Sequence, residues 1–129
     1  MGGQDMEEAE IKDLLSRKRQ YEAEYKFLSD LLEKSGAEER IAQEAAEIKS
    51  KITRINLWLE LLPEDEAIVI TRHLVDGIDV PRIMLEYEKK WSSEFAKTER
   101  TIKMYQSRAL KRIVEFEKRM QAVKKGEVK

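Results

Sequence analysis

The sequence predicts an all-α protein, and three observations support this prediction. Hydrophobic residues recur at spacings of three and four along most of the 129 residues, which is the period of an amphipathic helix. Charged residues make up 40% of the chain, a share typical of long helices with solvated faces. Only five glycines and two prolines interrupt the pattern, and no stretch alternates between apolar and polar residues as a half-buried strand would.

Residues 1–61 are expected to form an N-terminal antiparallel helical hairpin. Its two apolar stripes are Ile11, Leu14, Tyr21, Tyr25, Leu28 and Leu32, with a polar position at Lys18, and then Ile41, Ala45, Ile48, Ile52, Ile55, Leu59 and Leu62. Gly36 can cap the first helix, so two helices of about 25 residues are joined by a short turn. Leu31, Leu57, Trp58 and Leu61 fall outside the stripes. They need a further surface, either the C-terminal unit or a second copy of the chain.

The next two helices are predicted over residues 62–75 and 80–91. Pro63 fits a first helical turn, where its missing N–H costs nothing, and the acidic run that follows it favours that end of the helix dipole. This helix is expected to stop at Asp76 and Gly77. Asp79 can cap the following helix, with Pro81 in its first turn. The pattern leaves open whether that helix ends near residue 92 or continues to Phe95.

The last helix is predicted from the N-cap Thr98 through residue 113. Its apolar stripe continues beyond that point: Ile102, Ala109, Ile113, Phe116, Met120 and Val123. Three segments follow from these boundaries. Residues 1–61 form the hairpin, residues 62–123 form a three-helix unit, and residues 124–129 form a tail that is expected to fray.

The net charge of −1 conceals a marked asymmetry along the chain. Residues 1–61 carry 10 basic and 14 acidic side chains, and residues 62–96 carry 4 and 8. Residues 97–129 carry 11 basic and only 4 acidic side chains, a local charge of +7. A basic C-terminal quarter on a near-neutral protein indicates a surface that faces a polyanion, although a solvated Lys-rich helix would have the same composition.

The sequence holds no catalytic or metal-binding pattern, so we expect no enzyme activity, no metal and no cofactor. There is no Cys, and His73 is the single histidine, which excludes thiolate chemistry and a histidine cluster. No Gly-rich phosphate loop, zinc-protease motif or calcium loop is present. The acidic residues are interpreted as helix-surface partners of Lys and Arg. No apolar run has the length of a membrane span, so a cytoplasmic protein with no membrane contact is expected.

Residues 62–75, 80–91 and 98–113 have the order and lengths of a helix-turn-helix with a preceding support helix. In such a unit the last helix enters the DNA major groove. The predicted contacts to double-stranded DNA are Thr98, Arg100, Thr101, Lys103, Met104, Ser107, Arg108 and Lys111. Arg100, Lys103 and Arg108 are the main contacts, Lys111 lies near a groove wall, and Thr101, Met104 and Ser107 are candidates for base edges. Thr98 caps the helix and directs its N–H groups at a phosphate.

The run from Thr98 to Ile113 resembles the recognition helix of bacterial sigma factor region 4. It shares the Ser/Thr start, the charged triplet Glu99-Arg100-Thr101, and the ending Arg108-Ala109-Leu110-Lys111-Arg112-Ile113. The segment from Leu62 through Gly77 resembles that family's entry helix and turn. A helical arm followed by this unit resembles the ArpU-type late transcription regulators of Gram-positive phages. Glu99 before Arg100 and Met104 in place of a frequent Gln depart from the sigma pattern, so no sigma promoter sequence is carried over.

The resemblance implies a sequence-specific transcription regulator of phage or prophage origin. Its hairpin would form a homo-oligomer, with a dimer favoured, or bind RNA polymerase. One alternative is a phage small terminase subunit, which also joins a helix-turn-helix to an oligomerisation arm and assembles into rings. Another is a helical adaptor that binds only proteins. The mass in solution separates the regulator, expected as a dimer, from the terminase subunit, expected as a ring. The absence of salt-dependent DNA binding would favour the adaptor.

Overall fold

The computed structural model describes residues 6–35, 38–91 and 98–124, and within them every regular element is a helix, which confirms the all-α class. The elements, in chain order, are α1 (Glu8–Ser16), α2 (Lys18–Ser35), α3 (Glu39–Leu61), α4 (Glu64–Val69), the π-helix η1 (Ile70–Val75), α5 (Val80–Trp91) and α6 (Glu99–Lys124). The predicted cap at Gly36, the stretch from residue 92 to 97 and the tail beyond Lys124 lie outside these residues.

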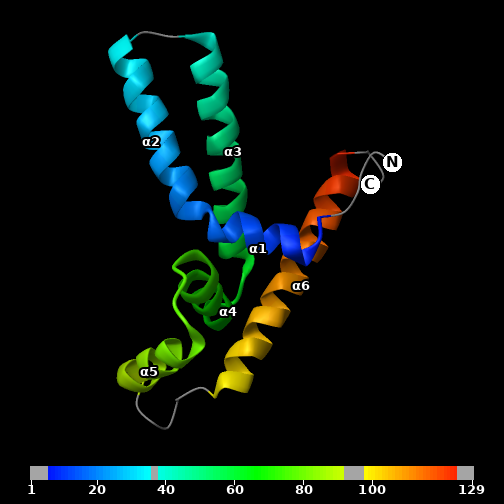
Figure 1. Ribbon diagram of the computed structural model, residues 1–129. Helices are drawn as coiled ribbons and strands as arrows, with labels where there is room; N and C mark the ends of the chain where they lie inside the picture. The colour runs from blue at the N-terminus through cyan, green and yellow to red at the C-terminus, as the bar shows by residue number, and fades with distance from the viewer. Residues whose placement is uncertain (1–5, 36–37, 92–97, 125–129) are drawn as a thin grey trace.

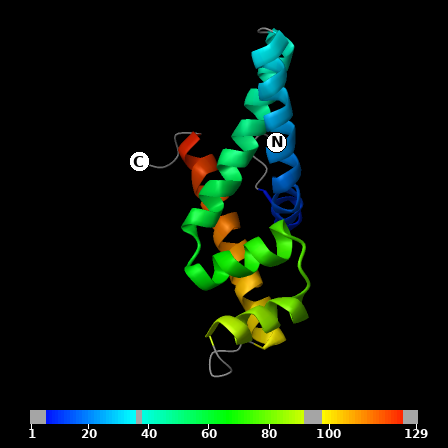
Figure 2. The same ribbon diagram turned by 90° about the vertical axis from the view of Figure 1, so that its left-hand side faces the viewer.

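Helices α2 and α3 lie side by side and run in opposite directions, forming a projection that we call the α2–α3 arm (Figure 1). Tyr21, Ala45 and Ile55 are the buried positions along its seam. Two lysines of α3 cover tyrosine rings of α2, with Lys51 Nζ 5.2 Å from the centre of the Tyr21 ring. Figure 2 shows that the arm extends one end of an elongated molecule, with α5 at the other end.

The expected long first helix is wrong, because the chain breaks at Arg17. This residue has φ −98° and ψ 2°, and its N–H bonds to the carbonyls of Asp13 and Leu14, both at 3.2 Å. The two pieces pack against different surfaces: α1 buries Ile11 and Leu15 under the arm, while α2 continues into the arm. One straight helix could not satisfy both surfaces. The buried position is therefore Leu15, and Leu14 of the expected stripe is only half-buried.

The main core lies where α1, the base of the arm, η1 and α6 meet. Its buried members come from all of these elements: Ile11, Leu15, Tyr21, Ile55, Trp58, Leu62, Ile70, Val75, Ala109, Leu110 and Ile113. Trp58 is fully buried there and is the largest side chain of the core. The core therefore joins residues on both sides of the expected boundary between residues 61 and 62.

A second, smaller core lies between α4, α5 and the first turns of α6. Its buried members are Val69, Ile83, Tyr87 and Ile102. The predicted continuous helix over residues 62–75 changes to π geometry at Ile70, where the N–H of Asp76 bonds to the carbonyl of Thr71 at 2.8 Å. This wider turn buries Ile70 and Val75 together, five residues apart. Gly77 follows with φ +71°, a backbone conformation that favours glycine, and it ends the helix as expected.

Candidate nucleic-acid interface

Thr98 caps α6, as the sequence predicts. Its side-chain Oγ1 accepts a hydrogen bond from the N–H of Thr101 at 3.1 Å, and its carbonyl accepts from the N–H of Ile102 at 3.0 Å. The two threonine hydroxyls also lie 2.9 Å apart. The cap satisfies one of the N–H groups that a helix start leaves without a partner, so it fixes where α6 begins.

The buried face of α6 determines which side chains are left for a partner. Ile102, Ala109, Leu110, Ile113 and Glu117 are buried, and they recur at helical spacing on one side. The predicted contact residues lie elsewhere on the helix: Thr98, Arg100, Lys103, Met104, Ser107, Arg108 and Lys111 are exposed, and Thr101 is half-buried.

Six of these residues share one face of α6. Arg100, Lys103, Met104, Ser107, Arg108 and Lys111 follow one another at spacings of three, one, three, one and three. Such spacing keeps side chains on one side of an α-helix, and here it is the side opposite the buried face. The structure thus brings the six together as one exposed strip, which we call the α6 strip.

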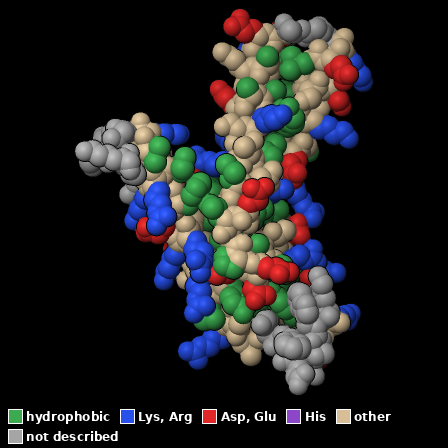
Figure 3. Space-filling view, turned by 180° about the vertical axis from the view of Figure 1, so that it is seen from behind, with side chains coloured by type: hydrophobic (Ala, Val, Ile, Leu, Met, Phe, Trp, Pro, Cys, Tyr) green, Lys and Arg blue, Asp and Glu red, His purple; other side chains and the backbone are tan. Residues whose placement is uncertain are grey.

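The whole of α6 is basic, with eight Lys and Arg residues against three Glu residues. In Figure 3 the Lys and Arg side chains gather along the flank of the molecule that α6 forms. Close cationic groups with few acidic neighbours raise the local concentration of a polyanion. The strip therefore has the electrostatics that a phosphate backbone requires.

Three basic residues of α6, namely Lys103, Arg112 and Lys118, are already engaged by carboxylates. Lys103 Nζ lies 2.9 Å from Glu99 Oε1, and both side chains are more than half exposed, so the pair is weak. Arg112 Nε donates to Glu66 Oε1 at 2.9 Å, and Glu66 is buried. Within the described residues, Arg100, Arg108 and Lys111 make no ion pair. Lys118 Nζ lies 3.8 Å from Glu115 Oε1.

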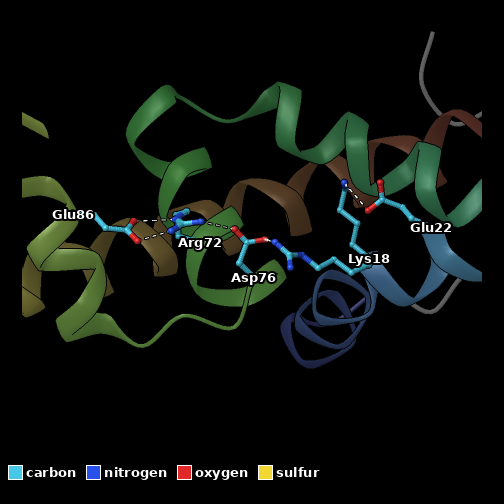
Figure 4. Close-up of polar contacts among 6 residues, drawn as sticks. Lys18, Glu22, Arg72, Asp76 and Glu86 are labelled. Atoms are coloured by element: carbon cyan, nitrogen blue, oxygen red, sulfur yellow. Dashed lines mark hydrogen bonds and ion pairs between the residues drawn. The ribbon is translucent and has the colours of Figure 1, made fainter.

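Arg72 of η1 forms ion pairs with the elements next to the strip. Its guanidinium binds the Glu86 carboxylate on α5 through two hydrogen bonds, with Nε 2.9 Å from Oε2. The same guanidinium donates to Asp76 at 2.9 Å, and Asp76 in turn accepts from Arg19 of α2 at 2.6 Å (Figure 4). The chain of ion pairs therefore joins α5 and η1 to the base of the arm.

Arg72 and Glu86 alter each other's proton affinity. The hydrogen bonds from Arg72 lower the pKa of Glu86, and those to Glu86 raise the pKa of Arg72. Burial raises the pKa of Tyr87 in the second core to about 12, with the nearby Asp65 and Glu64 carboxylates acting in the same direction. Nδ1 of His73 lies 2.8 Å from the Ile78 carbonyl, so the histidine contributes to the turn after η1.

A second group of polar residues fixes the other end of α6, and sequence reasoning missed it. Glu117 is buried; it accepts a hydrogen bond from Trp58 Nε1 at 2.9 Å and an ion pair from Arg54. Burial lowers the pKa of Arg54. The expectation that acidic residues are helix-surface partners of Lys and Arg is wrong for Glu66 and Glu117, which are buried. Arg112 of α6 binds Glu66 on α4. A buried Trp whose N–H needs an acceptor was the one available signal.

No metal-binding group and no membrane-spanning helix appear in the part of the chain that the structure describes. Three or more His, Asp or Glu side chains do not come together there in a cluster that would hold a metal ion. None of the helices in those ranges is both long and apolar enough to cross a membrane.

Comparison with known proteins returned no family model, no curated protein and no solved structure that matches this chain significantly. The proposed function is therefore based on the α6 strip, on the helices that hold it, and on the resemblance of residues 98–113 to the recognition helix of sigma factor region 4.

Proposed function

We propose that this chain is a DNA-binding transcription regulator that reads the major groove with residues 98–113 of α6. The observation that carries the proposal is the α6 strip: exposed basic residues interleaved with Met104 and Ser107, at the capped start of a helix held by a separate small core. A helix of this kind fits the width of the major groove, and its first turns meet the base edges. The phage or prophage origin rests on the sequence resemblance alone.

Each strip residue has a physical role in this proposal. Arg100 and Arg108 reach a phosphate or the guanine edge, and Lys111 reaches the far groove wall. Lys103 joins them by exchanging its exposed partner Glu99 for a phosphate, an exchange that costs little because the pair is solvated. Met104 and Ser107 face the bases.

Thr98 and Thr101 act at the helix start. The free N–H groups next to the Thr98 cap favour a phosphate there, as at other helix starts. Thr101 is half-buried and its hydroxyl bonds to Thr98, so it contacts a base edge only when that bond is exchanged.

The test is DNA binding as a function of salt. The purified protein is titrated with mixed genomic duplex fragments, alongside a Lys103→Ala/Arg108→Ala variant. Each lost phosphate contact reduces the slope of log affinity against log salt by about 0.9, so the variant is expected to lose about one to two units of slope. Sequencing the fragments that the wild type retains then identifies the preferred site.

A Lys26→Ala/Lys34→Ala variant is the matched control, because it removes two positive charges from α2 on the arm. Its slope should equal that of the wild type. If both variants retain the wild-type slope, α6 does not contact DNA. If the wild type itself does not bind duplex DNA at low salt, the proposal is wrong. A helical adaptor that binds proteins through the arm is then favoured.

A further inference from the structure

Beyond the point where Trp58 contacts Glu117, the helices α3 and α6 diverge (Figure 1). Side chains of both helices line a hollow there. The hollow measures about 520 Å³ and has an apolar floor that includes Leu57, Phe116 and Met120. We call this hollow the α3–α6 groove. Leu61 lies beside it, in a neighbouring hollow that shares Phe116 with it. The groove itself lies on a different side of α6 from the α6 strip, so both surfaces can be occupied at once.

The floor of the groove is unusually exposed for its residue types. Leu57 is 46% and Met120 39% exposed, and Leu61 beside the floor is 50% exposed. Leu57 and Leu61 are four residues apart on α3, and Phe116 and Met120 are four apart on α6, so two apolar stripes border the hollow. Hydrophobic side chains can be seen between the arm and the end of α6 in Figure 3. This geometry suits a helix or a helical hairpin as occupant.

The rim of the groove is basic. Lys49 and Lys124 border it, and so do Arg54 and Glu117, whose charges are satisfied by each other. The occupant that fits is therefore apolar along its contact and acidic at its edges.

The α2–α3 arm has that chemistry. Residues 22–47 carry eight acidic and three basic side chains, a net charge of −5. Phe27 is 66% exposed on the arm, and beside it lie the apolar Leu28 and Ile48 and the acidic Glu24 and Glu44. An exposed aromatic residue between carboxylates complements an apolar floor between lysines.

The arm cannot enter the groove of its own chain. Helix α3 is continuous from Glu39 to Leu61, so the same helix forms the arm and one wall of the groove.

We propose that the α3–α6 groove receives the α2–α3 arm of a second copy, so that two chains exchange arms around a two-fold axis. Each copy then supplies one arm and one groove, which is the self-complementary contact typical of two-fold dimers. The dimer leaves both α6 strips free, so it extends the proposed function to two reading helices. Its test contains no DNA, so failure of the dimer and failure of DNA binding can be distinguished.

The test is the mass of the protein in solution by light scattering, at concentrations of about 10 to 100 µM, without DNA. The wild type is expected at twice the 15.2 kDa chain mass. Met120→Asp places a charge on the groove floor and should give the monomer mass. Leu85→Asp is the matched control, because Leu85 is 55% exposed on α5 away from the groove, and it should keep the dimer mass. Circular dichroism checks that each variant retains its helices.

Charge reversal tests the pairing itself. Lys49→Glu/Lys124→Glu reverses the groove rim, and Glu24→Lys/Glu44→Lys reverses the flanks of Phe27. Each variant alone should be a monomer, because like charges then meet at both contacts. Mixed in equal amounts, the two should form a heterodimer, since each arm then meets a groove of opposite charge.

Three outcomes would overturn the proposal. One is a monomeric wild type over the whole concentration range. Another is dimers that persist in both charge-reversed variants, which would place the interface elsewhere. The third is a ring of about eight to ten chains, the assembly that a head-to-tail contact produces and that a small terminase subunit would form.

Discussion

The two parts of α6 lie in different surroundings although they belong to one continuous helix. Residues 99–108 rest on the small second core through Ile102 and expose all of the α6 strip except Lys111. Residues 109–124 enter the main core through Ala109, Leu110 and Ile113, and the buried Glu117 ties them to α3. The well-anchored part therefore sets the direction of the helix, while the lightly supported part leaves most of its polar and basic side chains exposed.

The largest expected effect concerns the anchored part. Trp58→Ala removes the largest buried side chain of the main core and leaves Glu117 without one of its donors. The free energy of unfolding should fall by about 3–5 kcal/mol. Urea denaturation measures it. Asn56→Ala, at an exposed position two residues away on α3, should change the free energy by less than about 0.5 kcal/mol. Equal effects of the two variants would show that Trp58 does not anchor α6.

A smaller loss is expected from the polar contact in the same region. Arg54→Met leaves the buried Glu117 carboxylate with Trp58 as its donor, at a cost of about 1–3 kcal/mol. In a Glu117→Met background the same change should cost much less, because no buried charge is left unpaired. A double-mutant cycle by urea denaturation measures the difference. Identical costs in both backgrounds would mean that the pair contributes nothing.

Removal of the Thr98 cap should destabilise only the start of α6. Thr98→Ala removes the oxygen that accepts from the Thr101 N–H and should destabilise the helix start by about 1 kcal/mol. Thr98→Ser retains an acceptor and should be close to the wild type. Amide hydrogen exchange is the measurement, with faster exchange expected at residues 101–103 and unchanged rates at residues 113–117. Faster exchange along the whole helix would contradict the independence of its two parts.

The smallest effect is the pH dependence of the pair between Arg72 and Glu86. The pKa of Glu86 is lower in the folded protein, so its contribution is present above the ordinary carboxyl pKa and disappears as the pH falls through the lowered value. Both side chains are more than one-third exposed, so Arg72→Met should cost only about 0.2–1 kcal/mol at neutral pH. The difference from the wild type should vanish in acid. Lys89→Met on α5 is the control and should show no such pH-dependent difference.

The sequence predicts the local features of the fold well. The helical period, the Thr98 cap, the stop at Gly77 and the exposed α6 strip all depend on residues within a few positions of one another. Such features are set by short-range sterics and hydrogen bonds, which a pattern of residue types records. Whether the strip binds DNA stays a prediction.

The features that sequence reasoning missed depend on distant contacts. The ion pairs of Arg54 with Glu117, Arg112 with Glu66 and Arg19 with Asp76 join residues 46 to 63 positions apart. Arg19, Asp76 and Arg112 each have a residue of opposite charge three or four positions away, so their pattern resembles ordinary surface pairing. Arg54, Glu66 and Glu117 have no such neighbour, and nothing in their local sequence points to their partners. The break at Arg17 involves neither Gly nor Pro, and it arises because α1 and α2 pack on different surfaces.

DNA crosslinking from single cysteines tests most directly whether the first part of α6 contacts DNA. The absence of native Cys makes the crosslinking specific. Ser107→Cys and Ala122→Cys place a photoactivatable crosslinker on the same side of α6, one in each part of the helix. With duplex DNA bound at low salt, we expect efficient crosslinking from position 107 and little from position 122. Crosslinking from position 122 alone, or from neither position while DNA is bound, would contradict the proposal that the first part of α6 reads DNA.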